Sequence, residues 1–576
     1  MASYHVAVHV KRTVRRRGDK EYIYLSLVES VRVDGKKTHR TLCRLGEVGE
    51  LEASGQLDRI IAALSSYTDT HFIASSEIEG AGAPSFGAIA AIDAYFDRLG
   101  LRAHFSSIGR SRRSKSLADT VFVMLANRLC EPGSKRRTIL EWMNTVALPG
   151  GVTEPLLDQC YRALDAVADA KGPTEELLYS RLINLTNLDL RLALYDLTST
   201  YFETSSGPSK KFSSRTYGYS RDKRGDRPQV VIGLLVTGNG IPIAHYVFPG
   251  NTRDSTTLTE VMTDYQARFG VGRIALVADR GLISEKNLAD VAGAGFDHVL
   301  ATRLHHDADV AAVLEQAVAA TKESWVPVPG IDGTAATEVF HGGRRFVAVL
   351  STKRKERDDH RRAELVARTE EKLISLADRV RSGRLVDPAK IGAAADRILR
   401  DSGVGRCFST KIRAGVFAWD YDEATMAYEE ELLAGRYVLT TSLTKEQASV
   451  ADVVRHYRML EKVERRFRVM KDFLGLRPVY HRTEERVRGH VALCVIAAVV
   501  EAVMGNDLEL AGVKDPDLLD QTISPRRAIA ELAEIRLHRL SAGRSVEVID
   551  RPTPLQRQIL DAFGVDASGW VKARIS

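Results

Sequence analysis

The sequence predicts a multidomain α/β protein, and three observations lead to this fold class. The chain has 576 residues, whereas single hydrophobic cores usually stop growing at roughly 250–300 residues. The spacing of its apolar residues changes several times, from strand-like alternation to helical periodicity and then to continuous apolar strands. An apolar fraction of 44% with charges of both signs is typical of a folded, soluble chain.

Two domains are expected ahead of the centre of the chain. Residues 3–46 alternate between polar and apolar side chains and carry turn signals, which predicts a small antiparallel sheet. We expect a basic, β-rich N-terminal domain over 1–73. The spacing then becomes helical, and we expect a helical domain over 87–189.

The central segment has the strand order of an RNase H-like sheet. Three apolar strands come first, the first of them containing Asp196, and are followed by a helix, a strand ending in Asp279, a second helix and a last strand. In that arrangement the first and fourth strands are neighbours, so Asp196 and Asp279 are predicted to come together. The first part of this core is expected over 190–308.

The core is predicted to be interrupted. Residues 309–440 contain strand-like pieces and a long charged helix that do not continue the pattern, and we expect an inserted β-rich domain there. The core is expected to resume over 441–510, and a helical tail to cover 511–576.

A helix predicted over 449–474 carries a carboxylate in an unexpected place. On a 3.6-residue period, Val463 and Phe467 belong to one apolar stripe, Glu464 borders that stripe, and Glu461 points to solvent. A carboxylate at the buried side of a helix is costly unless it is paired or binds a cation. Glu464 is therefore a candidate metal ligand, with a salt bridge as the alternative.

Positive charge is concentrated in three separate segments. Eleven Lys and Arg stand against four Asp and Glu in 1–44, eight against two in 106–137, and eleven against five in 455–488. Such a distribution suits an extended polyanion better than one small acidic ligand. Ordinary solvated faces are the alternative for each segment.

Asp196, Asp279 and Glu464 together would supply oxygen ligands for hard divalent cations. Two such ions can activate a water or a 3′-hydroxyl and stabilise the leaving oxygen of an in-line displacement. Each Asp taken alone is more typical of a turn or a helix cap than of a metal ligand. The combination indicates phosphodiester chemistry.

The motifs around these residues resemble a known family. YDLTSTYFE, VADRGLIS and the spacing of Tyr457, Glu464 and Lys471 are similar to those of the DDE transposases of bacterial insertion sequences. Within them, the resemblance is to the group with a Tyr-Arg-Glu-Lys signature and a β-rich domain inserted in an RNase H-like core. It covers roughly 190–505.

This resemblance implies roles for individual residues. Asp196, Asp279 and Glu464 would form the catalytic triad that holds two Mg²⁺ or Mn²⁺ ions. The position of the signature arginine is Leu460 here, so Arg458 or Lys462 would contact phosphate in its place. Other DNA contacts are expected from Tyr457, Lys471, Arg15, Arg16 and Arg17, and Trp325 and Trp419 are candidates for base stacking, with a core role as the alternative for each tryptophan.

The resemblance also implies cut-and-paste transposition from terminal inverted repeats into target DNA by a homodimer, commonly through a hairpin intermediate. We expect a cytoplasmic protein without a membrane segment, because no run of about 18 apolar residues is evident.

Other functions are weighed against this one. A transposase that has lost its activity but still binds DNA, with a regulatory role, is the main alternative. A glycosidase gives no role to the basic segments, and a phosphatase would need a second Asp where Thr198 stands. Zinc at His305-His306-Asp307 is disfavoured because adjacent residues point apart.

Overall fold

The computed structural model contains two compact units, which are described separately. The helix expected after Asp279 lies largely outside the described residues, and His305, His306 and Asp307 lie wholly outside them. The described residues are 8–33, 36–65, 67, 79–80, 82–108, 113–186, 192–204, 212–269, 275–279, 289, 293, 295–302, 308–413, 415–518, 520–541, 545–568, 570 and 574–575.

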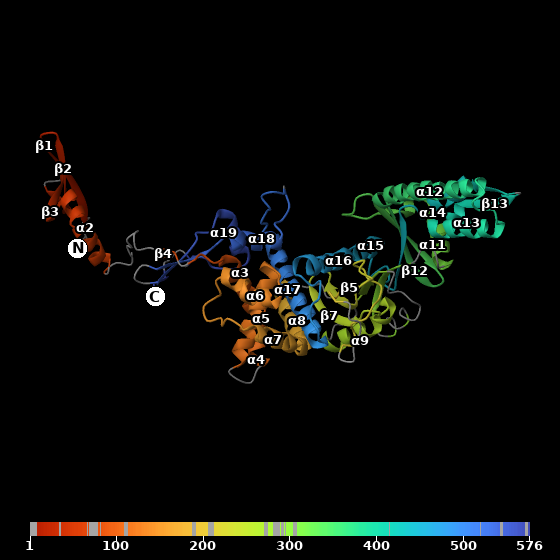
Figure 1. Cartoon of the computed structure of the whole chain (residues 1–576), viewed down its shortest axis with the longest axis horizontal. Helices are drawn as coiled ribbons and strands as arrows, with labels where there is room; N and C mark the ends of the chain where they lie inside the picture. Colours follow the sequence, from red (N-terminus) through yellow and green to blue (C-terminus); the bar gives the residue numbers. More distant parts are fainter. Residues whose placement is uncertain are drawn as a thin grey trace. The chain divides into compact units, whose positions relative to one another are not determined.

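The first unit combines the N-terminal segment with two short C-terminal segments. Its antiparallel sheet consists of β1 (Val8–Arg17), β2 (Lys20–Val33) and β3 (Lys36–Glu47), and two helices follow, α1 (Val48–Ala53) and α2 (Gln56–Ser65) (Figure 1). Gly18, with φ of +61°, makes the tight turn between β1 and β2. A small second sheet contains β4 (Glu79–Gly80), β16 (Leu537–Ser541), β17 (Ser545–Ile549) and β18 (Arg574–Ile575).

The second unit is built on a nine-stranded mixed sheet, ordered β10-β11-β12-β15-β9-β8-β5-β6-β7. Strand β5 pairs antiparallel with β6 and parallel with β8, and β8 pairs parallel with β9. The predicted proximity of the first and fourth core strands is therefore confirmed, and this half of the sheet fits an RNase H-like core. The strands are β5 (Leu192–Tyr201), β6 (Gln229–Thr237), β7 (Pro242–Pro249), β8 (Ala275–Ala278) and β9 (Asp297–Ala301).

The expected β-rich domain over 309–440 is corrected by the sheet pairing. Strand β15 pairs with both β9 and β12, so the four strands β10 (Val326–Pro327), β11 (Thr334–His341), β12 (Arg344–Ser351) and β15 (Arg436–Thr441) extend the core sheet. An alternating pattern predicts a strand but not its partner, because pairing depends on distant segments. Helix α11 (Ala308–Ala319) packs against these added strands. A second hydrophobic cluster joins elements that are mainly helical: α12 (Thr352–Arg381), α13 (Pro388–Ser402), α14 (Glu423–Leu433) and the hairpin β13 (Phe408–Arg413) and β14 (Val416–Tyr421).

Residues 87–189 form helices that share one hydrophobic core with the sheet. Helix α17 (Glu484–Leu510) is long and apolar enough to cross a membrane, but 83% of its most apolar window is buried in the protein. A Cβ on its Gly489 would lie 2.0 Å from the Leu164 carbonyl oxygen, so only glycine permits this approach of α17 to α7. The helices are α3 (Gly87–Arg98), α4 (Leu101–Ile108), α5 (Arg113–Cys130), α6 (Lys135–Leu140), α7 (Leu157–Asp169) and α8 (Lys171–Thr186), with α18 (Pro525–Ala533) and α19 (Pro554–Ala562) near the C-terminus.

The two faces of the core sheet belong to different layers. Side chains alternate along β5. Tyr195 faces a cluster that includes α9 (Leu258–Phe269), whereas Leu194 faces the larger cluster that contains Val463 and α17. Asp196 therefore lies on the same face as Leu194, where the segment with Glu464 packs.

Candidate functional site

Asp196 and Asp279 lie on neighbouring strands at the same level. The parallel register pairs Leu192 with Ala275 and Leu194 with Val277, and two further steps bring Asp196 beside Asp279, which directly follows β8. Paired residues in parallel strands point to the same face of the sheet. Both carboxylates are therefore directed to the face covered by the segment with Glu464.

Glu464 is brought to this face by α16 (Leu460–Arg468), which packs against β5. The expected continuous helix over 449–474 is wrong in detail: α15 (Val450–Arg458) ends at a break at Met459, and a π-helical turn, η7 (Val469–Phe473), follows α16. Apolar periodicity continues through both irregularities, so the pattern did not reveal them.

The burial expected of Glu464 is also corrected. Val463 is fully buried and Phe467 is 6% exposed, but Glu464 itself is exposed, as is Glu461. The stripe was identified correctly, and Glu464 lies beyond its edge. Because Glu464 is exposed, it does not require a buried salt bridge. Its assignment as a metal ligand is supported instead by its position near Asp196.

The charges of Asp279 and Glu464 act on the pKa of Asp196. The pKa of Asp196 is raised to about 7, mainly by burial, and the Asp279 and Glu464 carboxylates also raise it. Two groups lower this pKa: the Leu197 N–H, which donates to Asp196 Oδ1 over 2.7 Å, and the charge of Arg221. Within the described part of the chain, no three Asp, Glu, His or Cys side chains are close enough to coordinate one ion. The donor set nevertheless fits Mg²⁺, which usually takes one or two carboxylates and fills its other positions with water and phosphate.

The raised pKa of Asp196 predicts a pH-dependent stability in the metal-free protein. Between its ordinary value of 3.8 and about 7, the folded state binds more protons than the unfolded state, so the free energy of unfolding falls as pH rises. Asp196→Asn removes this penalty and should gain on the order of 2 kcal/mol above pH 7, allowing for solvent access, and little at pH 4. Thermal unfolding in EDTA at both pH values measures this, and an equal gain at both would contradict it.

Tyr457 is held inside this site. Its hydroxyl donates to Asp279 Oδ1 over 3.4 Å, and its ring centroid lies 5.8 Å from that of Tyr437 on β15. Burial and the nearby Asp279 raise the pKa of its hydroxyl. Tyr457 therefore connects α15 to one of the candidate metal ligands.

Lys471 is also engaged within the protein. Its Nζ lies 2.8 Å from Asp222 Oδ1, and Arg477 Nη1 lies 2.5 Å from the same oxygen. The side chains of Asp222 and Lys471 are only 5% and 10% exposed. Asp222 thus binds two cations from the segment that follows Glu464.

The loop between β5 and β6 supplies residues near the carboxylates that were not among the predicted site residues. Arg221, the neighbour of Asp222, donates from Nη2 to Asp254 Oδ2 over 2.6 Å and from its backbone N–H to Ser199 Oγ over 3.0 Å. The segment GYSRDKRGDRPQ of this loop is mainly basic. The loop contains three acidic residues, Glu203, Asp222 and Asp226, and no pattern in the sequence distinguishes Asp222 from the other two.

Comparison with known families agrees with this geometry. The family model described as "Transposase DDE domain" matches residues 191–500, which is 310 of the 576 residues. The chain belongs to the DDE transposases of insertion sequences. The model described as "IS1634 family transposase, N-terminal domain" matches residues 10–76. The protein is thus a DNA transposase, an enzyme of DNA cleavage and strand transfer, and its family depends in general on divalent metal ions.

Two further comparisons add little. One solved structure similar to this transposase is a cryo-EM structure of a piggyBac transposase synaptic complex with hairpin DNA. It is 9% identical, covers 77% of this chain and 79% of its own, and has a TM-score of 0.35. No curated protein matches the chain significantly. The family assignment rests on the two family models.

The residues at and beside the signature-arginine position differ in how freely their side chains could contact DNA. Leu460 is 9% exposed and belongs to the hydrophobic core. Lys462 donates from Nζ to the Gly238 carbonyl oxygen over 2.6 Å. Arg458 forms an exposed ion pair of 2.9 Å with Glu461, and such pairs contribute little to stability. Arg458 is therefore the more available of the two candidate replacements.

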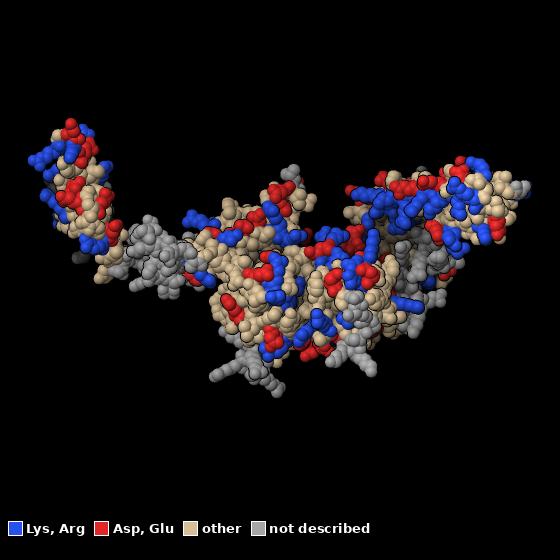
Figure 2. All heavy atoms as spheres, viewed as in Figure 1, with Lys and Arg blue, Asp and Glu red and all other residues tan. Residues whose placement is uncertain are grey.

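The remaining predicted DNA contacts lie on other elements. Trp325 and Trp419 are partly buried and pack against hydrophobic clusters of the segment 309–440, which agrees with the alternative of a core role. Arg15, Arg16 and Arg17 are exposed on β1. Figure 2 shows Lys and Arg side chains spread over that sheet among Asp and Glu.

Proposed function

We propose that this transposase cuts DNA at the ends of its insertion sequence and joins them to target DNA by a cut-and-paste reaction. Asp196, Asp279 and Glu464 are the proposed catalytic residues and hold two divalent ions, Mg²⁺ or Mn²⁺. The observation that carries the proposal is the arrangement of three elements: the register of β5 and β8 puts Asp196 beside Asp279, and α16, which carries Glu464, packs against β5. It indicates that carboxylates from β5, the end of β8 and α16 share one site.

The surrounding residues hold the proposed ligands in position. When bound, the ions would activate the attacking oxygen and stabilise the leaving oxygen of a phosphodiester. The Leu197 N–H fixes one oxygen of Asp196, and the Tyr457 hydroxyl fixes one oxygen of Asp279. Arg221 places a positive charge near Asp196, which partly offsets repulsion between the carboxylates.

Metal-dependent cleavage tests this function directly. A labelled duplex with the ends of the flanking genomic element is incubated with the transposase in Mg²⁺, Mn²⁺ or EDTA. We expect cuts at the element boundary in either metal and none in EDTA. Binding of the duplex without cleavage in any metal would instead support the alternative of an inactive, DNA-binding protein.

DNA contacts are proposed for the exposed cations. Arg458 would meet phosphates near the carboxylates, and Arg15, Arg16 and Arg17 would meet them elsewhere on the inverted repeats or target DNA. Tyr457, Lys462 and Lys471 already have protein partners, so we assign them a positioning role unless DNA displaces those partners. We propose that the transposase acts as a homodimer on two ends.

The N-terminal arginines are expected to contribute to binding through counterion release. Replacing Arg15, Arg16 and Arg17 together with alanine should weaken DNA binding and lower the slope of log affinity against log salt by roughly 3, because each phosphate contact contributes about 0.9. Anisotropy titrations at several salt concentrations measure the slope. The control replaces three exposed cations elsewhere, Arg381, Arg384 and Lys390. Equal slopes for both variants would remove β1 from the DNA-binding surface.

A further inference from the structure

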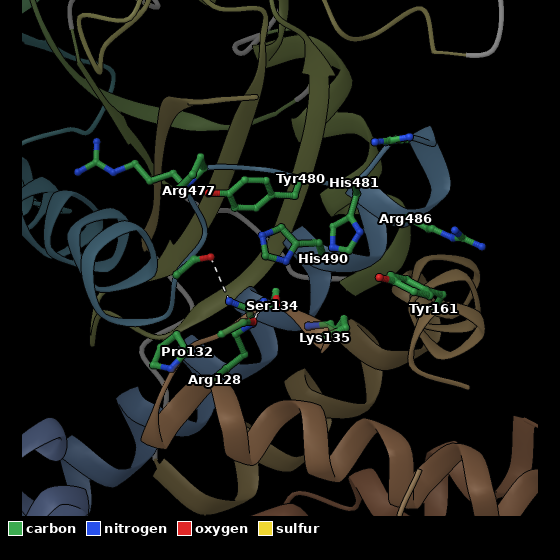
Figure 3. Close-up of a pocket in the computed structure, with 14 residues that line it drawn as sticks. Arg128, Pro132, Ser134, Lys135, Tyr161, Arg477, Tyr480, His481, Arg486 and His490 are labelled. Carbon is green, nitrogen blue, oxygen red and sulfur yellow. Dashed lines mark hydrogen bonds between the residues drawn. The ribbon is translucent and has the colours of Figure 1, made fainter. Parts of the chain in front are cut away.

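A cavity of about 540 Å³ lies outside the carboxylate site. Its wall combines Arg128, residues 132–135 and Tyr161 with eight residues between Gly475 and His490, in the segment that follows α16 and η7 (Figure 3). None of its lining residues, all of which the structure describes, is Asp or Glu. Five are cationic: Arg128, Lys135, Arg477, Arg482 and Arg486.

Lys135 is the least compensated charge in this wall. The residue is 3% exposed, and its ammonium group has no hydrogen bond or ion pair within the part of the chain that the structure describes. Burial and the nearby Arg128 lower the pKa of Lys135 to about 7. A buried, unpaired ammonium group is costly, so an anion in the cavity would relieve a destabilising charge.

Arg128 adds a positive charge that has no ion pair among the described residues. Its guanidinium donates to the carbonyl oxygens of Leu474, Gly475 and Gly133 over 3.2, 3.1 and 3.3 Å. Carbonyl oxygens satisfy its hydrogen bonds but carry no net charge. The cavity therefore keeps the positive potential of Arg128 as well as that of Lys135.

The pKa values of two histidines in this wall are lowered by burial and by the nearby cations. Burial lowers the pKa of His481 to about 3, and that of His490 also falls, with Arg128 and Lys135 contributing to both. Figure 3 shows the two rings next to each other, and their centroids are 5.3 Å apart. His490 Nε2 lies 3.1 Å from the Leu476 carbonyl oxygen, to which the neutral ring can donate. Both rings stay uncharged at neutral pH and leave the charge to Lys and Arg.

Aromatic side chains lie beside these cations. Tyr480, 68% exposed, lines the cavity. The Tyr161 ring centroid is 5.0 Å from the Arg486 guanidinium and 6.4 Å from the His481 ring. Cations combined with aromatic faces suit a nucleic-acid strand, whose phosphates pair with cations and whose bases stack. The volume is within the ordinary range for an organic ligand.

We propose that this cavity binds a backbone phosphate of the DNA strand held by the transposase, with Lys135 and Arg128 as its counter-charges and Tyr480 against the adjacent base. Arg477 connects the cavity with the carboxylate site, since it lines the cavity and bonds Asp222, the neighbour of Arg221. Arg221 and Arg477 thus lie between Asp196 and the cavity that contains Arg128 and Lys135. The proposal goes beyond the cleavage function, because none of these residues belongs to the carboxylate triad.

The test compares Lys135→Met with Arg136→Met in EDTA, where binding does not depend on cleavage. Arg136 is the exposed neighbour of Lys135 and does not line the cavity. Two quantities are measured: the unfolding temperature in phosphate and in chloride at equal ionic strength, and the anisotropy of a labelled end duplex at several salt concentrations. Arg482→Ala, at an exposed lining position, reports on the cavity without altering the core.

The expected result has two opposite parts. Lys135→Met should unfold at a higher temperature than the wild type in chloride, because the unpaired ammonium is gone, and phosphate should stabilise only the wild type and Arg136→Met. Lys135→Met should also bind the duplex roughly tenfold more weakly, as for loss of a charged hydrogen bond, and Lys135→Met and Arg482→Ala should each lower the salt slope by about 1.

Other outcomes would overturn the proposal. Phosphate stabilisation of the wild type with unchanged DNA affinity in both cavity variants would assign the cavity to a small free phosphate compound. No phosphate effect and unchanged salt slopes would make Lys135 a structural residue. Failure of metal-dependent cleavage would leave these binding measurements intact, so the two proposals can fail separately.

Discussion

Glu464→Gln is expected to abolish DNA cleavage while leaving binding of the insertion-sequence ends intact. The amide has nearly the same shape but lacks the charge that would hold a divalent cation. Glu464 is exposed, so the exchange should cost little stability. The rate should fall roughly a thousandfold or more, because a bound ion supplies several kcal/mol of transition-state stabilisation.

Glu461→Gln is the matched control for this experiment. Glu461 lies three residues earlier on the same helix, is exposed, and has an ion pair with Arg458. Single-turnover cleavage and anisotropy of both variants separate catalysis from binding. If Glu464→Gln cleaved DNA at nearly the wild-type rate and Glu461→Gln did not, the third metal ligand would be Glu461, and its assignment to Glu464 would be wrong. Asp196→Asn and Asp279→Asn should show the same loss as Glu464→Gln.

Asp222→Ala is expected to lose both stability and activity. Its carboxylate is the common partner of Lys471 and Arg477, and it is 5% exposed. Removing one member of a buried ion pair typically costs about 3–5 kcal/mol, because the remaining charge loses its compensation. Cleavage should fall as well, since Asp222 follows Arg221, whose charge acts on Asp196.

The same loop provides the control. Asp226 is 60% exposed and pairs with Arg224, so Asp226→Ala should change stability by less than about 1 kcal/mol. In the double variant Asp222→Ala/Lys471→Met, stability should recover in part, because the unpaired ammonium is removed together with its partner. Chemical denaturation of the three variants measures these differences. Equal destabilisation by Asp222→Ala and Asp226→Ala would contradict a special role for Asp222.

The strands of the core could be predicted from their apolar sequences, and the pairing of β5 with β8 from the order of strands and helices along the chain. Strands β5 to β9 are apolar segments, and their order with the intervening helix places β5 beside β8. The meeting of Asp196 and Asp279 follows from that neighbourhood and from the register. The pairing of β15 with β9 did not follow, because a strand's sequence does not name its partner.

The three carboxylates of the proposed site were selected from the sequence, whereas the residues that contact them were not. Asp222 stands between Arg221 and Lys223, and composition alone described that loop as basic. Its ion pairs are with Lys471 and Arg477, about 250 residues later, and no local pattern connects such distant residues. Glu464 was selected for a burial that it does not have, although its neighbours Val463 and Phe467 were placed correctly.

Because strands from 309–440 belong to the same sheet as the core, this segment cannot be removed without exposing a sheet edge. A truncation that removes 309–440 would delete β12 and nearly all of β15, the strand that pairs with β9. Strand β9 would then become an edge whose unpaired N–H and C=O groups are a template for pairing with another chain. Such a truncated protein should aggregate rather than behave as a minimal nuclease. Removing only the helical part between β12 and β15 and joining these two antiparallel strands by a short turn keeps the sheet closed at that point.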